Sequence, residues 1–119
     1  LLSLGSLRVQ QNKPVEARDY IQQAMPFYEK GGYRKEVAQA NILLGRSFQM
    51  TENFDEAIEA FKKVENSEDD SIRAYVQLAL GAVLLNQERL PEALQRFNKS
   101  FELYQTIGNR YLIVFSLIN

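Results

Sequence analysis

Three segments of this chain repeat one pattern, and the spacing of that pattern limits the folds open to it. They read "LGSLRVQQNKPVEARDYIQQA", "LGRSFQMTENFDEAIEAFKKV" and "LGAVLLNQERLPEALQRFNKS", beginning at Leu4, Leu44 and Leu80. Each segment opens with Leu-Gly, carries Glu-Ala twelve residues after the leucine, and has a bulky apolar residue four positions after the alanine. The members of the three series are Gly5, Gly45 and Gly81; Ala17, Ala57 and Ala93; and Ile21, Phe61 and Phe97. Repeats of this size indicate stacked supersecondary units.

Each repeat is predicted to form two helices, so the fold class is all-α. Apolar residues recur at helical spacing before and after a short polar turn. Pro14 and Pro91 follow the turn, where the first turn of a helix accepts proline. Glycines at Gly31–Gly32 and Gly108 predict helix ends. The predicted architecture is a solenoid of three helix pairs plus part of a fourth, because one pair cannot bury its own apolar face.

The steps between repeats are 40 and then 36 residues, a difference close to one helical turn. We therefore expect the second helices of repeats one and three to be about one turn longer than that of repeat two. The predicted boundaries within this single array are 1–32 for repeat 1, 33–66 for repeat 2, 67–108 for repeat 3 and 109–119 for the first helix of a truncated repeat 4. We expect the chain to be part of a longer protein.

Composition excludes several classes of function. The net charge is −1, so no basic surface is available to hold a nucleic acid or an anionic membrane. The absence of Cys and His removes thiol nucleophiles, histidine catalysis and Cys/His zinc sites. The longest apolar run, "YLIVFSLI", is shorter than a membrane helix requires. We expect no cofactor, no metal and no catalytic residue, and therefore no enzyme.

Two acidic stretches could form either a catalytic or metal-binding site or a structural feature of a helix. Asp55, Glu56 and Glu59 could serve acid–base catalysis, but their helical spacing favours a solvated helix face. The stretch "ENSEDDS" could hold calcium, yet it lacks the spacing and central glycine of a calcium loop. We expect one of its residues, Ser67, Asp69, Asp70 or Ser71, to cap the next helix.

The pattern resembles the tetratricopeptide repeat family, whose repeats carry Leu-Gly, an aromatic residue three positions on, an alanine at the start of the second helix, and then a bulky and a small residue. Repeat two matches fully, repeat one has Arg8 at the aromatic position, and the Trp-like position holds Leu1, Asn41 and Gln77. The long spacing is similar to the subgroup with repeats of roughly 40 residues, which occurs in polarity adaptors, kinesin light chains and bacterial signalling proteins.

The resemblance implies a right-handed superhelical solenoid of antiparallel helix pairs. Its concave groove is lined by the first helices of the repeats and binds a protein or peptide partner. The corresponding positions here are Leu2, Ser6 and Val9; Gln39, Ile42, Arg46 and Gln49; Tyr75, Leu78, Ala82 and Leu85; and Phe115 and Ile118. An amphipathic helix or an extended peptide suits such a surface, with Arg46 and Tyr75 as its expected anchors. The alternative is that these first helices pack on each other or on an adjoining domain.

The resemblance also implies that the site with which some family members bind chaperone tails is absent from this chain. Family members that bind chaperone tails hold a terminal carboxylate with Lys, Asn and Arg, whereas the matching positions here are Leu2, Ser6, Leu43, Tyr75 and Ala79.

The expected function is therefore a non-catalytic interaction or scaffold module within a cytoplasmic adaptor or signalling protein. The alternative is a regulatory sensor segment that binds a peptide or small effector and controls a linked domain. Self-association through the C-terminal apolar helix is also expected.

Overall fold

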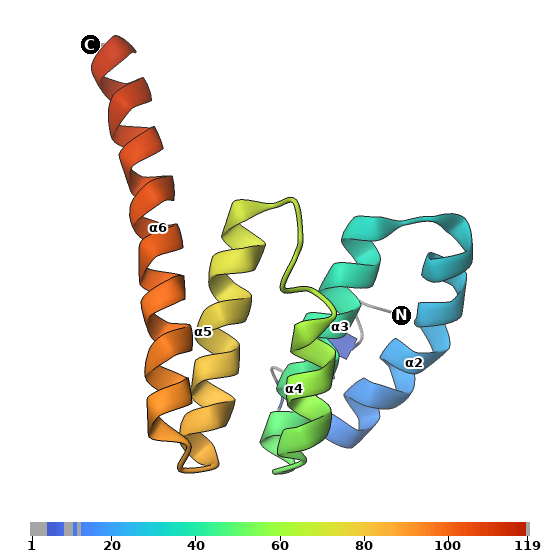
Figure 1. The fold of residues 1–119 in the computed structure, drawn as a ribbon. Helices are drawn as coiled ribbons and strands as arrows, with labels where there is room; N and C mark the ends of the chain where they lie inside the picture. Colours follow the sequence, from blue (N-terminus) through green and yellow to red (C-terminus); the bar gives the residue numbers. More distant parts are fainter. Residues whose placement is uncertain (1–4, 9–10, 12, 119) are drawn as a thin grey trace. The chain divides into compact units, whose positions relative to one another are not determined.

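The computed structural model describes residues 5–8, 11 and 13–118, with the side chains of 111–118 excepted. Every regular element in this part of the chain is a helix, which confirms the predicted fold class. The helices are α2 (Pro14–Gly31), α3 (Arg34–Met50), α4 (Phe54–Lys62), α5 (Asp70–Asn86) and α6 (Leu90–Ile118) (Figure 1). The chain forms two compact units, Leu1–Val64 and Glu65–Asn119.

The helices keep the register of the sequence repeat. α3 and α5 each have 17 residues, and their first residues lie 36 positions apart. The second helices of the three repeats begin at Pro14, Phe54 and Leu90, which reproduces the steps of 40 and 36. Pro14 is the first residue of α2 and Pro91 the second of α6, so both occupy a first turn as predicted.

The lengths of the second helices differ by more than the repeat steps predict. α2 has 18 residues and α4 has nine, so the expected direction is right but the expected difference of one turn is wrong. α4 ends at Lys62, and residues 63–69 form a connection to α5 that contains Asn66, Ser67 and Asp69. These side chains compete with the helix for backbone hydrogen bonds and favour turns and caps.

Of the two predicted glycine helix ends, one is confirmed and the other is wrong. Gly32 ends α2 in the left-handed conformation (φ 73°), and the next backbone N–H donates to the Tyr28 carbonyl at 3.0 Å. At Gly108 the helix continues, and α6 runs unbroken to Ile118. A helical glycine costs only about 1 kcal/mol relative to alanine, less than an uncompensated helix end. The repeat boundaries, including a fourth repeat over 109–119, remain a proposal.

The repeated glycines mark the close approach of paired helices. A Cβ atom built on Gly45 would lie 2.5 Å from Cε1 of Phe61, and one on Gly81 would lie 2.6 Å from Cε1 of Phe97. Gly5 approaches Ile21 in the same way. Only glycine allows these contacts, so the 16-residue spacing between glycine and bulky residue encodes the packing of each helix pair.

The repeated alanines and bulky residues of the second helices are buried, with one exception. The three repeated alanines have no exposed surface, and neither have Ile21 and Phe61. Phe97 is only half-buried, because α6 packs against α5 alone in its unit whereas Ile21 belongs to a core cluster with Ala40 and Leu43. The core therefore lies between α2 and α3, between α3 and α4, and between α5 and α6.

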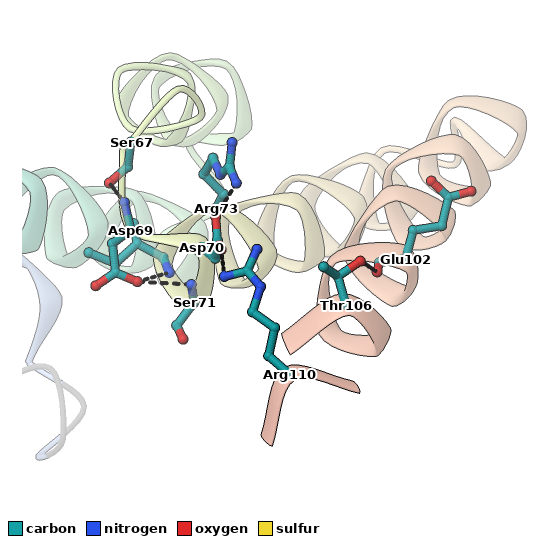
Figure 2. Close-up of polar contacts among 9 residues, drawn as sticks. Ser67, Asp69, Asp70, Ser71, Arg73, Glu102, Thr106 and Arg110 are labelled. Carbon is teal, nitrogen blue, oxygen red and sulfur yellow. Dashed lines mark hydrogen bonds and ion pairs between the residues drawn. The ribbon is translucent and has the colours of Figure 1, made fainter. Parts of the chain in front are cut away.

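The acidic stretch before α5 provides the expected helix cap. The Asp69 carboxylate accepts hydrogen bonds from the backbone N–H groups of Ser71 (2.8 Å) and Ile72 (3.1 Å), and Ser67 accepts one from the Asp69 backbone (Figure 2). These bonds satisfy helix N–H groups that have no partner within the helix. Of the four residues that could cap α5 according to the sequence, Asp69 is therefore the one that does so.

Replacing Asp69 by alanine is expected to destabilise the chain by about 0.5–2 kcal/mol, because two backbone donors lose their acceptor. Asp69→Ser should retain most of the stability, since a serine hydroxyl also caps helices. Urea denaturation followed by circular dichroism measures both. Glu68→Ala changes an exposed neighbouring carboxylate and is the control; equal losses in Asp69→Ala and Glu68→Ala would contradict the capping role.

Candidate functional site

The predicted groove residues of α3 lie along one side of that helix. Gln39, Ile42, Arg46 and Gln49 follow each other at intervals of three and four residues, so they share a face. Gln39 and Arg46 are exposed, and Ile42 and Gln49 are partly exposed. The alternating positions Ala40, Leu43 and Ser47 are buried. This set of four residues, the α3 stripe, is therefore a surface of the first unit.

The C-terminal end of α3 is fixed from α2 by an arginine that the sequence analysis did not single out. The Arg18 guanidinium donates to the Ser47 carbonyl at 3.0 Å and to Oγ1 of Thr51 at 3.1 Å. It also lies 4.7 Å from the centroid of the Phe48 ring, a cation–π contact. The only signal in the sequence is its position next to Ala17, at the edge of the buried face. Arg18 positions the helix that carries the α3 stripe.

The predicted groove residues of α5 form the corresponding surface in the second unit. Tyr75, Leu78, Ala82 and Leu85 stand 36 positions after the four residues of the α3 stripe and share its spacing. Leu78 and Leu85 are 43% and 49% exposed, and the other two side chains are partly exposed. This α5 stripe is more apolar than the α3 stripe and carries no charge.

A polar contact behind the α5 stripe explains the unusual residue at the Trp-like position. Gln77 is 7% exposed, and its Oε1 accepts a hydrogen bond from Arg96 of α6 at 3.2 Å. The same guanidinium forms an ion pair with Glu65 at 2.8 Å. The buried amide oxygen therefore has a donor, which offsets its loss of water. The sequence pattern shows Gln77 at the Trp-like position but does not indicate Arg96 as its partner.

The remaining predicted residues contribute less to a described surface. Leu2 and Val9 lie outside the described residues, and the side chains of Phe115 and Ile118 are likewise outside them. Among the positions that correspond to the carboxylate clamp of other family members, Leu43 and Ala79 are each only 9% exposed. Ser6 and Tyr75 are partly exposed. The α3 and α5 stripes belong to different units, so their union in one groove is part of the proposal below.

The carboxylates of α4 are exposed, in agreement with the predicted solvated face. Asp55, Glu56 and Glu59 all lie on the outer side of a helix that buries Ala57 and Phe61. Within the part of the chain that the structure describes, no group of three or more acidic side chains could hold a metal ion. The α4 carboxylates therefore serve as the polar face of an amphipathic helix.

One ion cluster joins the start of α5 to α6. Asp70 pairs with Arg73, one turn further along α5, and with Arg110, which lies beyond Gly108 on α6 (Figure 2). The hydrogen bond from Arg110, supported by Arg73, holds the pKa of Asp70 below its ordinary value of 3.8. The ionised form of Asp70 is thus favoured in the folded protein.

This lowered pKa predicts a loss of stability in acid. A carboxylate whose pKa is lower in the folded state stabilises the fold above its unfolded pKa, near 3.8, and loses that contribution as the pH falls through the folded value. Arg110→Gln should therefore lower the unfolding temperature at neutral pH, and the difference from the wild type should shrink toward zero below pH 3.8. Lys99→Gln removes an equal charge from exposed α6 surface and is the control. A pH-independent difference would contradict this role for Asp70.

A model of the tetratricopeptide repeat family matches residues 1–67, more than half of the chain. The chain belongs to the tetratricopeptide repeat family. No curated protein matches it at a significant level.

Membership of this family indicates a general class of function. Tetratricopeptide repeats generally mediate protein–protein interaction or scaffolding, and the family is typically non-enzymatic. Among the described residues, no helix combines the length and the apolar character needed to cross a lipid bilayer.

Proposed function

We propose that this chain is a non-catalytic interaction module that binds a peptide or helix of a partner protein along the α3 and α5 stripes. It would act as part of a larger cytoplasmic adaptor or signalling protein. The observation that carries the proposal is the equivalence of the two stripes. Four positions on each helix, in the same register of the repeat, stay accessible while the opposite face of the helix is buried.

The two stripes differ in the partner chemistry that they favour. Leu78 and Leu85 present accessible apolar surface at a spacing of two helical turns, and Tyr75 adds an aromatic side chain one turn before Leu78. Arg46 supplies a cation on the α3 stripe. Apolar side chains of a partner suit the α5 stripe, and a partner carboxylate suits Arg46 on the α3 stripe. Tyr and Arg are also the residue types that most often dominate binding energy.

The direct test uses the full-length protein as bait in a quantitative pull-down. Arg46→Ala and Tyr75→Ala together should abolish capture of the partners that the wild type retains. Lys62→Ala removes an exposed cation from α4 and should leave capture unchanged. Equal capture by the wild type and by the double variant would reject the proposed stripes, provided that both proteins show the same thermal unfolding.

The alternative function is that of a regulatory sensor segment, and a second experiment tests it. A sensor should gain thermal stability when a small effector binds its folded state, whereas a scaffold should respond to peptides or partner proteins only. Thermal scanning with metabolite and peptide panels separates the two. Nucleic acids and membranes are not proposed as partners, since the net charge is −1. Self-association through the C-terminal apolar helix is a separate proposal.

A further inference from the structure

The exposed face of α3 carries positive charge near both of its ends. Lys35 lies four residues before Gln39, so it continues the α3 stripe by one further turn toward the start of the helix. Lys35 and Arg46 are both exposed. Glu36, the single carboxylate of α3, follows Lys35 directly and therefore points about 100° away from it around the helix. We call Lys35 together with the α3 stripe the extended α3 face.

The stability of the first unit does not account for these two cations. Within the part of the chain that the structure describes, neither Lys35 nor Arg46 forms an ion pair or a side-chain hydrogen bond. A lysine in the first turn is also unfavourable for the helix itself, since that end carries a partial positive charge. Several other arginines, by contrast, form ion pairs within the chain, namely Arg8, Arg73, Arg89, Arg96 and Arg110.

The distance between the cations indicates what kind of anion fits them. Eleven residues separate Lys35 from Arg46, which corresponds to about 16 Å along the helix axis. A single phosphate group is too small to contact both. A nucleic acid carries a charge every few ångströms and would place most of its charges against the uncharged side chains in between, such as Ile42. Two carboxylates of one polypeptide match this distance when they lie roughly eleven residues apart in a helix, or about five apart in an extended segment.

We propose that the extended α3 face binds an acidic protein segment, in which two Asp or Glu side chains pair with Lys35 and Arg46 and an uncharged stretch between them lies along Gln39 and Ile42. This inference rests on the proposed function, because it names the partner chemistry of the α3 stripe. It differs from the capture of a terminal carboxylate by other family members, since neither cation lies at a clamp position. The charges recognised here belong to side chains within the partner segment.

A random peptide library displayed on phage tests the partner chemistry without knowledge of the natural partner. The full-length wild type and the double variant Lys35→Glu, Arg46→Glu would be panned against the same library. We expect the wild type to select peptides in which Asp or Glu flanks an uncharged stretch, and the double variant to select Lys or Arg in place of those carboxylates. Equal frequencies of Asp and Glu in the two selections would overturn the proposal, as would a wild type that enriches no peptide.

The peptide that the wild type selects most often then allows affinity to be measured. Lys35→Ala should weaken its binding by roughly threefold or more, because the partner carboxylate loses its cation. Raising the salt concentration from about 50 to about 500 mM should weaken binding by roughly tenfold, since exposed charges are screened. Arg34→Ala is the matched control: it removes an equally exposed cation from the same turn of α3, about 100° away from Lys35, and should have the smaller effect.

The same measurements separate this inference from the proposed function. If affinity fell in Tyr75→Ala and Arg46→Ala but was the same in Lys35→Ala and at both salt concentrations, the stripes would remain the binding site and the acidic partner would be rejected. If none of these changes altered the affinity, both proposals would fail. Losses in Lys35→Ala and Arg34→Ala of equal size would show a general attraction to positive charge and would contradict recognition by the extended α3 face.

Discussion

Replacing Phe61 by alanine is expected to lower the free energy of unfolding of the first unit by about 3–5 kcal/mol. The ring has no exposed surface and lies against the backbone of α3 at Gly45. Truncation removes a large apolar side chain and leaves a cavity, because a helix pair spaced by an aromatic ring cannot close fully around a methyl group. Urea denaturation of the variant and the wild type gives the difference.

A second phenylalanine provides the control for this prediction. Phe27 is 65% exposed, so Phe27→Ala should change stability by less than about 1 kcal/mol. Phe97→Ala should fall between the two, because Phe97 is half-buried against Gly81. If Phe61→Ala cost no more than Phe27→Ala, the packing of α4 on α3 described above would be wrong.

The largest effect of a small change is expected at Gly45. In Gly45→Ala the added Cβ would lie 2.5–2.7 Å from three ring atoms of Phe61, closer than carbon atoms approach. The ring is confined on all sides, so the helices must separate or the ring must leave its rotamer. Overpacking of this kind costs about 1–3 kcal/mol. That cost outweighs the gain of about 1 kcal/mol from replacing a helical glycine by alanine.

The matched change at Gly108 is expected to have the opposite sign. Gly108 is also within a helix, but its added Cβ would meet nothing within 4 Å. Gly108→Ala should therefore stabilise the chain by up to about 1 kcal/mol. Combining Gly45→Ala with Phe61→Leu should recover part of the loss, since a smaller side chain relieves the contact. Destabilisation by both alanine substitutions to the same extent would contradict the steric explanation.

The helix pairs could be predicted because their determinants are local and repeated. The distance from Gly45 to Phe61 recurs from Gly81 to Phe97, and both pairs are in contact in the structure. Pro14 and Pro91 marked the starts of α2 and α6 for an equally local reason, since a proline in the first turn of a helix removes no intrahelical hydrogen bond. Such features are contained within one repeat and need no knowledge of the rest of the protein.

The helix end at Gly108 was predicted wrongly because it depends on tertiary contacts. Gly32 and Gly108 occupy the same place in the repeat, but a glycine ends a helix only where the chain gains by reversing. At Gly32 the reversal allows α3 to pack on α2. Beyond Gly108, the structure instead pairs Arg110 with Asp70, two residues far apart in the sequence. A residue pattern within one repeat shows neither the packing of α3 on α2 nor the pairing of Arg110 with Asp70.

The accessible positions of α3 and α5 could be predicted from the sequence, but the contacts that support these helices could not; that the accessible positions form a binding site stays a prediction. The alternation of residues on α3 and α5 separates exposed from buried positions, and the eight stripe residues of these helices are accessible as expected. Arg18 and the contact between Gln77 and Arg96 were missed, because a family pattern describes what is usual at a position and not what replaces it.

The most direct test of the proposed function is a binding titration with a partner captured by the full-length protein. Affinity would be measured by calorimetry for the wild type, for Arg46→Ala, for Tyr75→Ala and for the α4 control Lys62→Ala. We predict that each stripe variant loses about 1–2 kcal/mol of binding free energy or more, while Lys62→Ala binds like the wild type. Equal affinity in all four proteins would show that the partner binds elsewhere and would contradict the assignment of function to the α3 and α5 stripes.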